Sequence, residues 1–174
     1  MRIISQARPA ILMQSLRKIV PFCDLTQWRN KLRPEDRPLV VTNGCFDLLH
    51  PGHIFLLESA RALGSRLLIG VTGDQSVRLL KGAGRPVIPD ADRVLMLCSL
   101  EAVSAVCLFA DLDAVSFLNA SRPDIYAKGG DYTLETINQD ERRLLEKMGT
   151  KIVIIPQFES RSTSSLLRRI TGLP

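Results

Sequence analysis

The two histidines of the chain stand three residues apart, in the segment His50-Pro51-Gly52-His53. The segment follows the apolar run Leu39 to Asn43, which has the length of a buried strand. Pro51 suits the first position of a helix, because the N–H that it lacks has no intrahelical partner there. Both histidines then point to the same side of the first turn. Imidazoles and unpaired N–H groups at a helix start are suited to bind phosphate oxygens and to stabilise charge that develops on them.

Two other readings of the histidine pair are a surface pair at an ordinary helix start and a zinc site. A zinc site needs further ligands, and the chain has no third histidine. Its cysteines, Cys23, Cys45, Cys98 and Cys107, form no Cys-x-x-Cys pair. We therefore predict reduced thiols and no metal-binding residues, and the combination of strand, Gly44-Cys45-Phe46-Asp47 and His50 to His53 favours phosphate chemistry.

The pattern around this segment is an alternation of apolar strands and helices. Helices are predicted at 25–32, at 52–63 closed by Gly64, at 91–100 after an N-cap at Asp90, from Asp111 to 119, at 139–148 and from Ser162 or Thr163 to 170. Strands are predicted at 39–43, 66–71, 105–109, 124–128 and 151–155. This order predicts an α/β fold, a doubly wound, Rossmann-like five-stranded parallel sheet with helices on both faces, whose ligand lies outside the carboxyl ends of the strands.

Length and composition limit the classes of protein that the chain can represent. Its 174 residues predict a poorly ordered extension at 1–15 and a single domain at 16–174. No apolar run approaches the roughly 20 residues that span a bilayer, so we expect no membrane contact and a cytoplasmic protein. The net charge of +5 suits an anionic ligand, and because the basic residues are scattered we expect no nucleic-acid partner.

Several segments carry a resemblance to a known family. Gly44-Cys45-Phe46-Asp47 and His50-Pro51-Gly52-His53 resemble the motifs of the HIGH-motif nucleotidyltransferase superfamily. More narrowly, the chain from about Lys18 to Ile170 is similar to the adenylyltransferases that make ADP-heptose from D-glycero-D-manno-heptose 1-phosphate. The narrower resemblance rests on Lys81 to Val87 followed by Asp92-Arg93, on Lys128-Gly129-Gly130-Asp131-Tyr132 and on Ser162-Thr163-Ser164.

The resemblance implies a reaction in which ATP and a sugar 1-phosphate give an ADP-sugar and pyrophosphate. The sugar phosphate attacks the α-phosphorus in line, with no covalent enzyme intermediate, and Mg²⁺ bridges phosphate oxygens. It also implies a homodimer, and a role in the ADP-heptose branch of lipopolysaccharide biosynthesis.

The resemblance also implies roles for individual residues. His50, His53 and Lys81 are the expected catalytic residues, with Lys81 as a mobile cation in a glycine-rich stretch that closes over the site. Acceptor contacts are expected from Asp47, Asp74, Lys81 and Arg93, although Asp74 also suits a helix cap and Arg93 a surface salt bridge. Nucleotide contacts are expected from Asn43, Gly44, Cys45, Phe46, His50, His53, Lys128, Gly129, Gly130, Asp131, Ser162 and Thr163.

One departure bears on the choice of nucleotide. Cytidylyltransferases of the superfamily carry Arg-Thr-x-Gly-x-Ser-Thr before the last helix, whereas this chain has Gln157 to Thr163 without the matching arginine and glycine. This favours ATP over CTP, although Arg161 offers a partial substitute. The alternatives are a cytidylyltransferase for glycerol 3-phosphate or ethanolamine phosphate, a riboflavin-phosphate adenylyltransferase, and a non-catalytic nucleotide- or RNA-binding module.

Overall fold

The computed structural model describes residues 14–130, 132–158, 163, 166, 167, 169 and 172. Within them, the predicted alternation of strands and helices is confirmed. The strands are β1 (Leu39–Gly44), β2 (Arg66–Thr72), β3 (Ala105–Phe109), β4 (Ile125–Gly129) and β5 (Lys151–Ile155). The helices are η1 (Phe22–Asp24), α2 (Leu25–Asn30), η2 (Pro34–Asp36), α3 (Pro51–Arg61), α4 (Asp74–Lys81), α5 (Asp90–Cys98), α6 (Val115–Ser121) and α7 (Gln139–Lys147).

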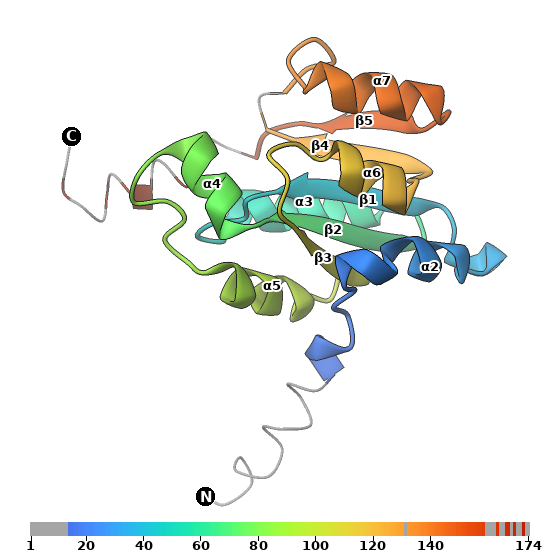
Figure 1. The fold of residues 1–174 in the computed structure, drawn as a ribbon, viewed down its shortest axis with the longest axis horizontal. Coiled ribbons are helices and arrows are strands. Elements are labelled where there is room, and N and C mark those ends of the chain that lie inside the picture. The colour runs from blue at the N-terminus through green and yellow to red at the C-terminus, as the bar shows by residue number, and fades with distance from the viewer. Residues whose placement is uncertain are drawn as a thin grey trace, which may run out of the picture.

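The strands form one parallel sheet in the order β3-β2-β1-β4-β5 (Figure 1). The order reverses between β1 and β4, which is the place where doubly wound sheets bind their ligands. β1 pairs with β2 along its whole length, from Leu39 to Gly44. In the described residues it pairs with β4 only at Val40 with Ile125 and at Val41 with Tyr126. The two central strands therefore lose their pairing toward their carboxyl ends.

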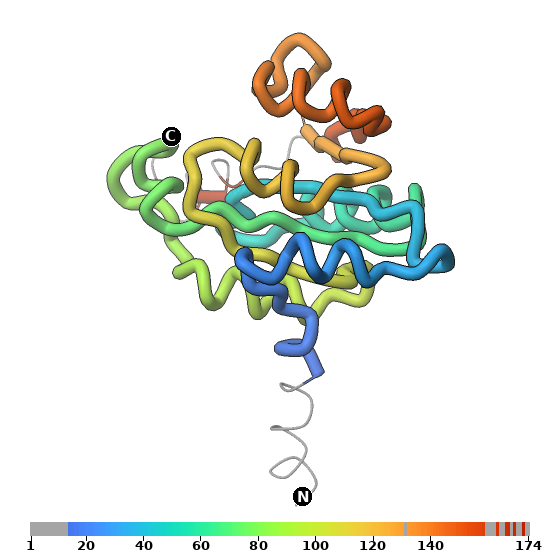
Figure 2. Tube along the Cα trace, turned by 45° about the vertical axis from the view of Figure 1, so that its right-hand side comes forward, coloured from blue at the N-terminus to red at the C-terminus, as the bar shows by residue number. Residues whose placement is uncertain are grey.

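Helices cover both faces of the sheet, as predicted. On one face, Leu57 of α3 and Leu97 of α5 pack with Val40 and Ala127 of the strands. On the other, Leu25 of α2, Phe117 of α6 and Leu145 of α7 pack with a second set of strand residues. In Figure 1, α2 and α6 lie in front of the sheet and α3 behind it, and Figure 2 shows α2 beside α6 on the same face. No helix of the described part is long and apolar enough to cross a membrane.

Several predicted helix boundaries were wrong. The segment 74–81 was expected as loop, but it forms α4. Asp90 does not cap α5; it is the first residue of that helix, and its carboxylate accepts a hydrogen bond from the N–H of Asp74 at the start of α4. Asp111 does not open α6, which begins at Val115 with the Asp113 carboxylate accepting from the Val115 N–H.

Two other predictions fall mostly outside the described residues. These are the N-terminal extension at 1–15, of which the structure describes only residues 14 and 15, and the last helix at 162–170. The domain boundary at 15/16 therefore stays a prediction.

Asp47 ties the loop after β1 to the segment that precedes α5. Its side chain is buried and accepts hydrogen bonds from Arg85 Nε at 2.7 Å and from the N–H groups of Val87 and Ile88 at 3.0 Å. Burial raises the pKa of this carboxyl, but the hydrogen bonds outweigh burial and hold the pKa below its usual range. The anchor fixes the loop that leads into α3.

Replacing Asp47 by Asn is expected to lower the free energy of unfolding by about 3 kcal/mol, because it leaves Arg85 without its buried counter-charge. The group has a lowered pKa in the folded state, so its contribution is complete above the unfolded pKa of about 3.9 and is lost as pH falls through the folded pKa. Urea unfolding of wild type and Asp47→Asn between pH 3 and pH 7 measures this.

The control is Asp140→Asn, whose partner Arg143 and own side chain are 72% and 66% exposed. Such exposed pairs contribute at most about 1 kcal/mol. Equal stability losses in the two variants at pH 7, or a pH-independent difference between wild type and Asp47→Asn, would contradict the anchoring role of Asp47.

Candidate functional site

A cleft of about 570 Å³ opens at the carboxyl ends of the central strands. Asn43 and Gly44 at the end of β1 line it, together with Lys128 and Gly129 at the end of β4. This is where the two strands lose their pairing, so the cleft follows directly from the strand order. The start of α3 forms one side of the cleft, and the segments that lead into α6 and α7 form another.

The histidine pair lies at the start of α3, as predicted. His50 is the N-cap residue in extended conformation, Pro51 occupies the first helical position, and both imidazoles line the cleft. The centroids of the two rings are 3.9 Å apart, and the His53 ring lies 5.4 Å from that of Phe46. The two imidazoles therefore act on the same small volume in front of the helix N-terminus.

Both histidines are neutral at pH 7. Burial lowers the pKa of His53 to about 4, and the charges of His50 and Lys81 lower it further against a smaller opposing effect of Asp47. Burial also lowers the pKa of His50. The Nδ1 atoms of both rings are buried and have no hydrogen-bond partner among the described residues. Neutral rings with unused polar atoms are ready to hydrogen-bond a ligand.

The loop before the histidines is tightly folded. Phe46 and Leu48 have φ values of 51° and 52°, in the left-handed region that residues other than glycine rarely adopt. A Cβ on Gly44 would lie 3.2 Å from the Phe46 ring, so glycine permits the close approach of ring and strand end. Cys45 and Phe46 line the cleft as expected. Such backbone geometry concentrates at functional sites.

Arg93, expected to contact the acceptor, is fully buried instead. Its guanidinium donates to the carbonyl oxygens of Ile88, Thr72 and Cys45 and to the Asp74 carboxylate, 2.8 Å from Nη2. Asp74 in turn is the first residue of α4. The expected acceptor contacts of Arg93 and of the equally buried Asp47 are therefore corrected, because both side chains hold loops together and neither has surface to offer a ligand.

The other expected residues are partly brought together. Lys81 ends α4 and lines the cleft, while Gly129 and Gly130 line it from β4. Thr163 also lines the cleft, and its hydroxyl donates to the carbonyl oxygen of Asp47 at 2.8 Å. Asp131 and Ser162 lie outside the described residues.

A second polar cluster on the cleft wall includes two residues that sequence reasoning missed, Tyr126 and Glu141. The Asn43 Oδ1 atom lies 3.0 Å from Lys128 Nζ and 2.5 Å from the Tyr126 hydroxyl. The hydroxyl also lies 3.2 Å from Glu141 Oε2, and Glu141 Oε1 accepts from the Ala114 N–H at 2.9 Å. In the sequence, Tyr126 is one residue of an apolar strand and Glu141 one of many charges, so only their position relative to the predicted strand ends could have indicated them.

Comparison with known proteins identifies the family of the chain. The model of the family described as cytidylyltransferase-like matches residues 41–170. The bifunctional protein HldE of Koribacter versatilis is 40% identical over 87% of this chain and 31% of its own length. The corresponding protein of Methylobacillus flagellatus is 44% identical over 80% of this chain and 28% of its own length. The chain thus spans about a third of the length of these curated relatives.

Two solved structures resemble the fold. A lipopolysaccharide core biosynthesis protein from Thermoplasma volcanium matches 70% of this chain and 98% of its own, with a TM-score of 0.60 and 25% identity. A pantoate-beta-alanine ligase from Francisella tularensis matches 90% of this chain and 73% of its own, with a TM-score of 0.54. At 14% identity the ligase supports the fold alone. With the family model covering most of the sequence, the chain belongs to the cytidylyltransferase-like family.

Proposed function

We propose that this chain is an adenylyltransferase, which transfers AMP from ATP to a sugar 1-phosphate and releases pyrophosphate. The acceptor proposed is D-glycero-D-manno-heptose 1-phosphate, and the product is an ADP-sugar. The observation that carries the proposal is the pair of neutral histidines at the start of α3, in a cleft where the strand order reverses. Family membership and the similarity to HldE proteins and to the Thermoplasma protein support it.

The proposed chemistry is positioning combined with stabilisation of charge. The positive end of the α3 dipole and the imidazoles of His50 and His53 hold the phosphates where negative charge increases during transfer. Lys81 adds a positive charge from the end of α4, and Thr163 adds a hydroxyl from the segment near the chain end. The loop residues Gly44 to Phe46 contribute backbone groups at the same edge, and no side chain acts as a nucleophile.

Mg²⁺ is proposed as a companion of the nucleotide. Within the described ranges, no group of three or more His, Cys, Asp or Glu side chains could hold a metal ion. Mg²⁺ binds phosphate oxygens and water readily and needs few protein ligands, so the residues present fit an ion delivered by the triphosphate. When bound, it would neutralise part of the phosphate charge beside the histidines.

ATP is proposed as the donor in preference to CTP. The stretch Gln157 to Thr163 lacks the arginine and glycine found at the matching positions of cytidylyltransferases. The homodimer expected from the resemblance remains a prediction, as does the role in lipopolysaccharide biosynthesis.

The direct test measures pyrophosphate release by the purified chain with ATP or CTP, each combined with a heptose 1-phosphate, glycerol 3-phosphate or ethanolamine phosphate. Release is expected with ATP and the sugar phosphate. His53→Ala is expected to lower kcat by about 100- to 1000-fold, since it removes a donor to the developing charge. Cys23→Ser, at an exposed position, serves as the control. Turnover with CTP alone, or full activity of His53→Ala, would overturn the assignment.

ATP binding is expected to draw a proton onto His53. The pKa of this imidazole is about 4 in the free protein, and a nearby triphosphate raises it because negative charge favours the imidazolium form. Calorimetric titration with ATP at pH 6, in two buffers of different ionisation enthalpy, measures the number of protons taken up. His53→Asn should abolish the uptake, and an equal uptake by this variant and the wild type would refute the assignment of the proton to His53.

A further inference from the structure

The polar cluster of Asn43, Tyr126, Lys128 and Glu141 lies on the opposite side of the sheet from the histidines. Val41 and Tyr126 belong to the apolar cluster that packs against α2, α6 and α7. Side chains alternate between the two faces of a strand, so Asn43 and Lys128, each two residues further on, point to this same face. His50 and His53 come from α3, on the other face. The cleft therefore has two chemically different walls.

Strand register explains why the cluster is open to a ligand. Val41 pairs with Tyr126, which places Asn43 opposite Lys128 two residues later, beyond the last pairing of β1 with β4. The two side chains meet across the opening, 3.0 Å apart, and both line the cleft. Glu141 approaches from the first half of α7 and also lines the cleft.

The cluster has unused hydrogen-bonding capacity. Tyr126 has a single hydroxyl proton, and the shorter contact, 2.5 Å to Asn43 Oδ1, takes it. Glu141 Oε2, 3.2 Å from the same hydroxyl, is then left to accept from another donor. Within the described part of the chain, Asn43 Nδ2 has no hydrogen bond, and the Lys128 ammonium has protons beyond the one given to Asn43. Donors and an acceptor alternate along this wall, which matches neighbouring hydroxyl groups.

Charge separates the two walls. A carboxylate at Glu141 repels phosphate, whereas the α3 wall offers a helix N-terminus and imidazoles that attract it. The burial of Lys128 lowers the pKa of its ammonium, while the charge of Glu141 opposes this effect. The negative charge of Glu141 therefore keeps a cation at this wall without making the wall attractive to a triphosphate.

We propose that Asn43, Lys128 and Glu141 form a subsite for the hydroxyl groups of the acceptor sugar, with Glu141 as the residue that selects for them. The inference rests on the proposed function. It reassigns Asn43 and Lys128 from the nucleotide, where they were expected, to the acceptor. In-line transfer requires the acceptor oxygen to approach opposite the leaving pyrophosphate, and two walls on opposite faces of the sheet provide for this.

The test compares wild type and Glu141→Gln on D-glycero-D-manno-heptose 1-phosphate and on its monodeoxy analogues, with ATP as donor. Gln can still accept from the Ala114 N–H, but it presents an NH₂ group where Oε2 accepted. Wild type is expected to lose about 10- to 100-fold in kcat/KM when the hydroxyl bound by Glu141 is missing, as for a hydrogen bond to a charged group. Glu141→Gln should reduce that discrimination to about threefold or less, with the KM for ATP changed less than twofold.

Glu146→Gln is the matched control, because it makes the same change at an exposed position of α7. It should discriminate like the wild type. Tyr126→Phe removes only the hydroxyl and is expected to weaken the same discrimination about threefold to tenfold, which gives a second measurement with the charge at position 141 retained.

Two results would overturn the proposal in distinguishable ways. If wild type turns over the sugar phosphate but Glu141→Gln loses the same factor with every analogue, the subsite is wrong and the proposed function stands. If Glu141→Gln instead raises the KM for ATP selectively, Glu141 belongs to the nucleotide site. If wild type turns over no sugar 1-phosphate with ATP, the proposed function and the subsite both fail.

Discussion

β1 and β4 are neighbours in the sheet, but the helices that follow them leave on opposite faces. This constraint opens the sheet at one edge and places α3 behind the opening and α6 and α7 in front of it. The loss of pairing beyond Val41 and Tyr126 leaves the ends of both strands free to present side chains. Every group in the cleft owes its position to one of these strand ends or to a segment that follows one.

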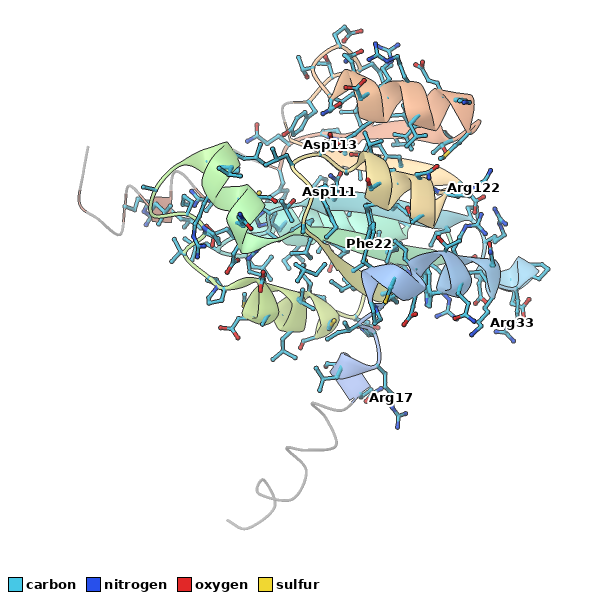
Figure 3. The ribbon with its side chains drawn as sticks, in the orientation of Figure 1. Arg17, Phe22, Arg33, Asp111, Asp113 and Arg122 are labelled. Atoms are coloured by element: carbon cyan, nitrogen blue, oxygen red, sulfur yellow. The ribbon has the colours of Figure 1, made fainter. Side chains whose placement is uncertain are left out.

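Burial sets the chemistry of the cleft as much as residue type does. Desolvation keeps His53 neutral, so that it offers a hydrogen bond without a permanent charge. Arg93 and Asp47 are charged but wholly engaged with the protein, and they fix the loop that leads into α3 to the segments around α4 and α5. Figure 3 shows Asp111 and Asp113 in the segment between β3 and α6, at the same end of the sheet as α4. The Asp113 side adds acidic groups to the wall that carries Glu141.

The sequence was sufficient for the strands and for the histidine centre, because short apolar runs and a Pro at a helix start are local patterns with one strong interpretation. It was insufficient where a side chain acts over a distance in sequence. Asp90 caps α4 sixteen residues away, and Arg93 reaches Cys45 across forty-eight. The partnership of Glu141 with Tyr126 depends on the packing of α7 against the sheet, which no local pattern records. Helix α4 was missed because the glycines after Lys81 suggested a loop throughout that region.

The central claim is that both substrates occupy the cleft together, on opposite walls, so that the sugar phosphate attacks the nucleotide directly. The stereochemistry at the α-phosphorus tests this claim. Wild-type protein would be supplied with the Sp diastereomer of ATPαS and D-glycero-D-manno-heptose 1-phosphate, and the configuration of the thio-ADP-sugar determined by ³¹P NMR. A single in-line displacement predicts inversion of configuration. Retention would require two displacements through an enzyme-bound nucleotide and would contradict the account.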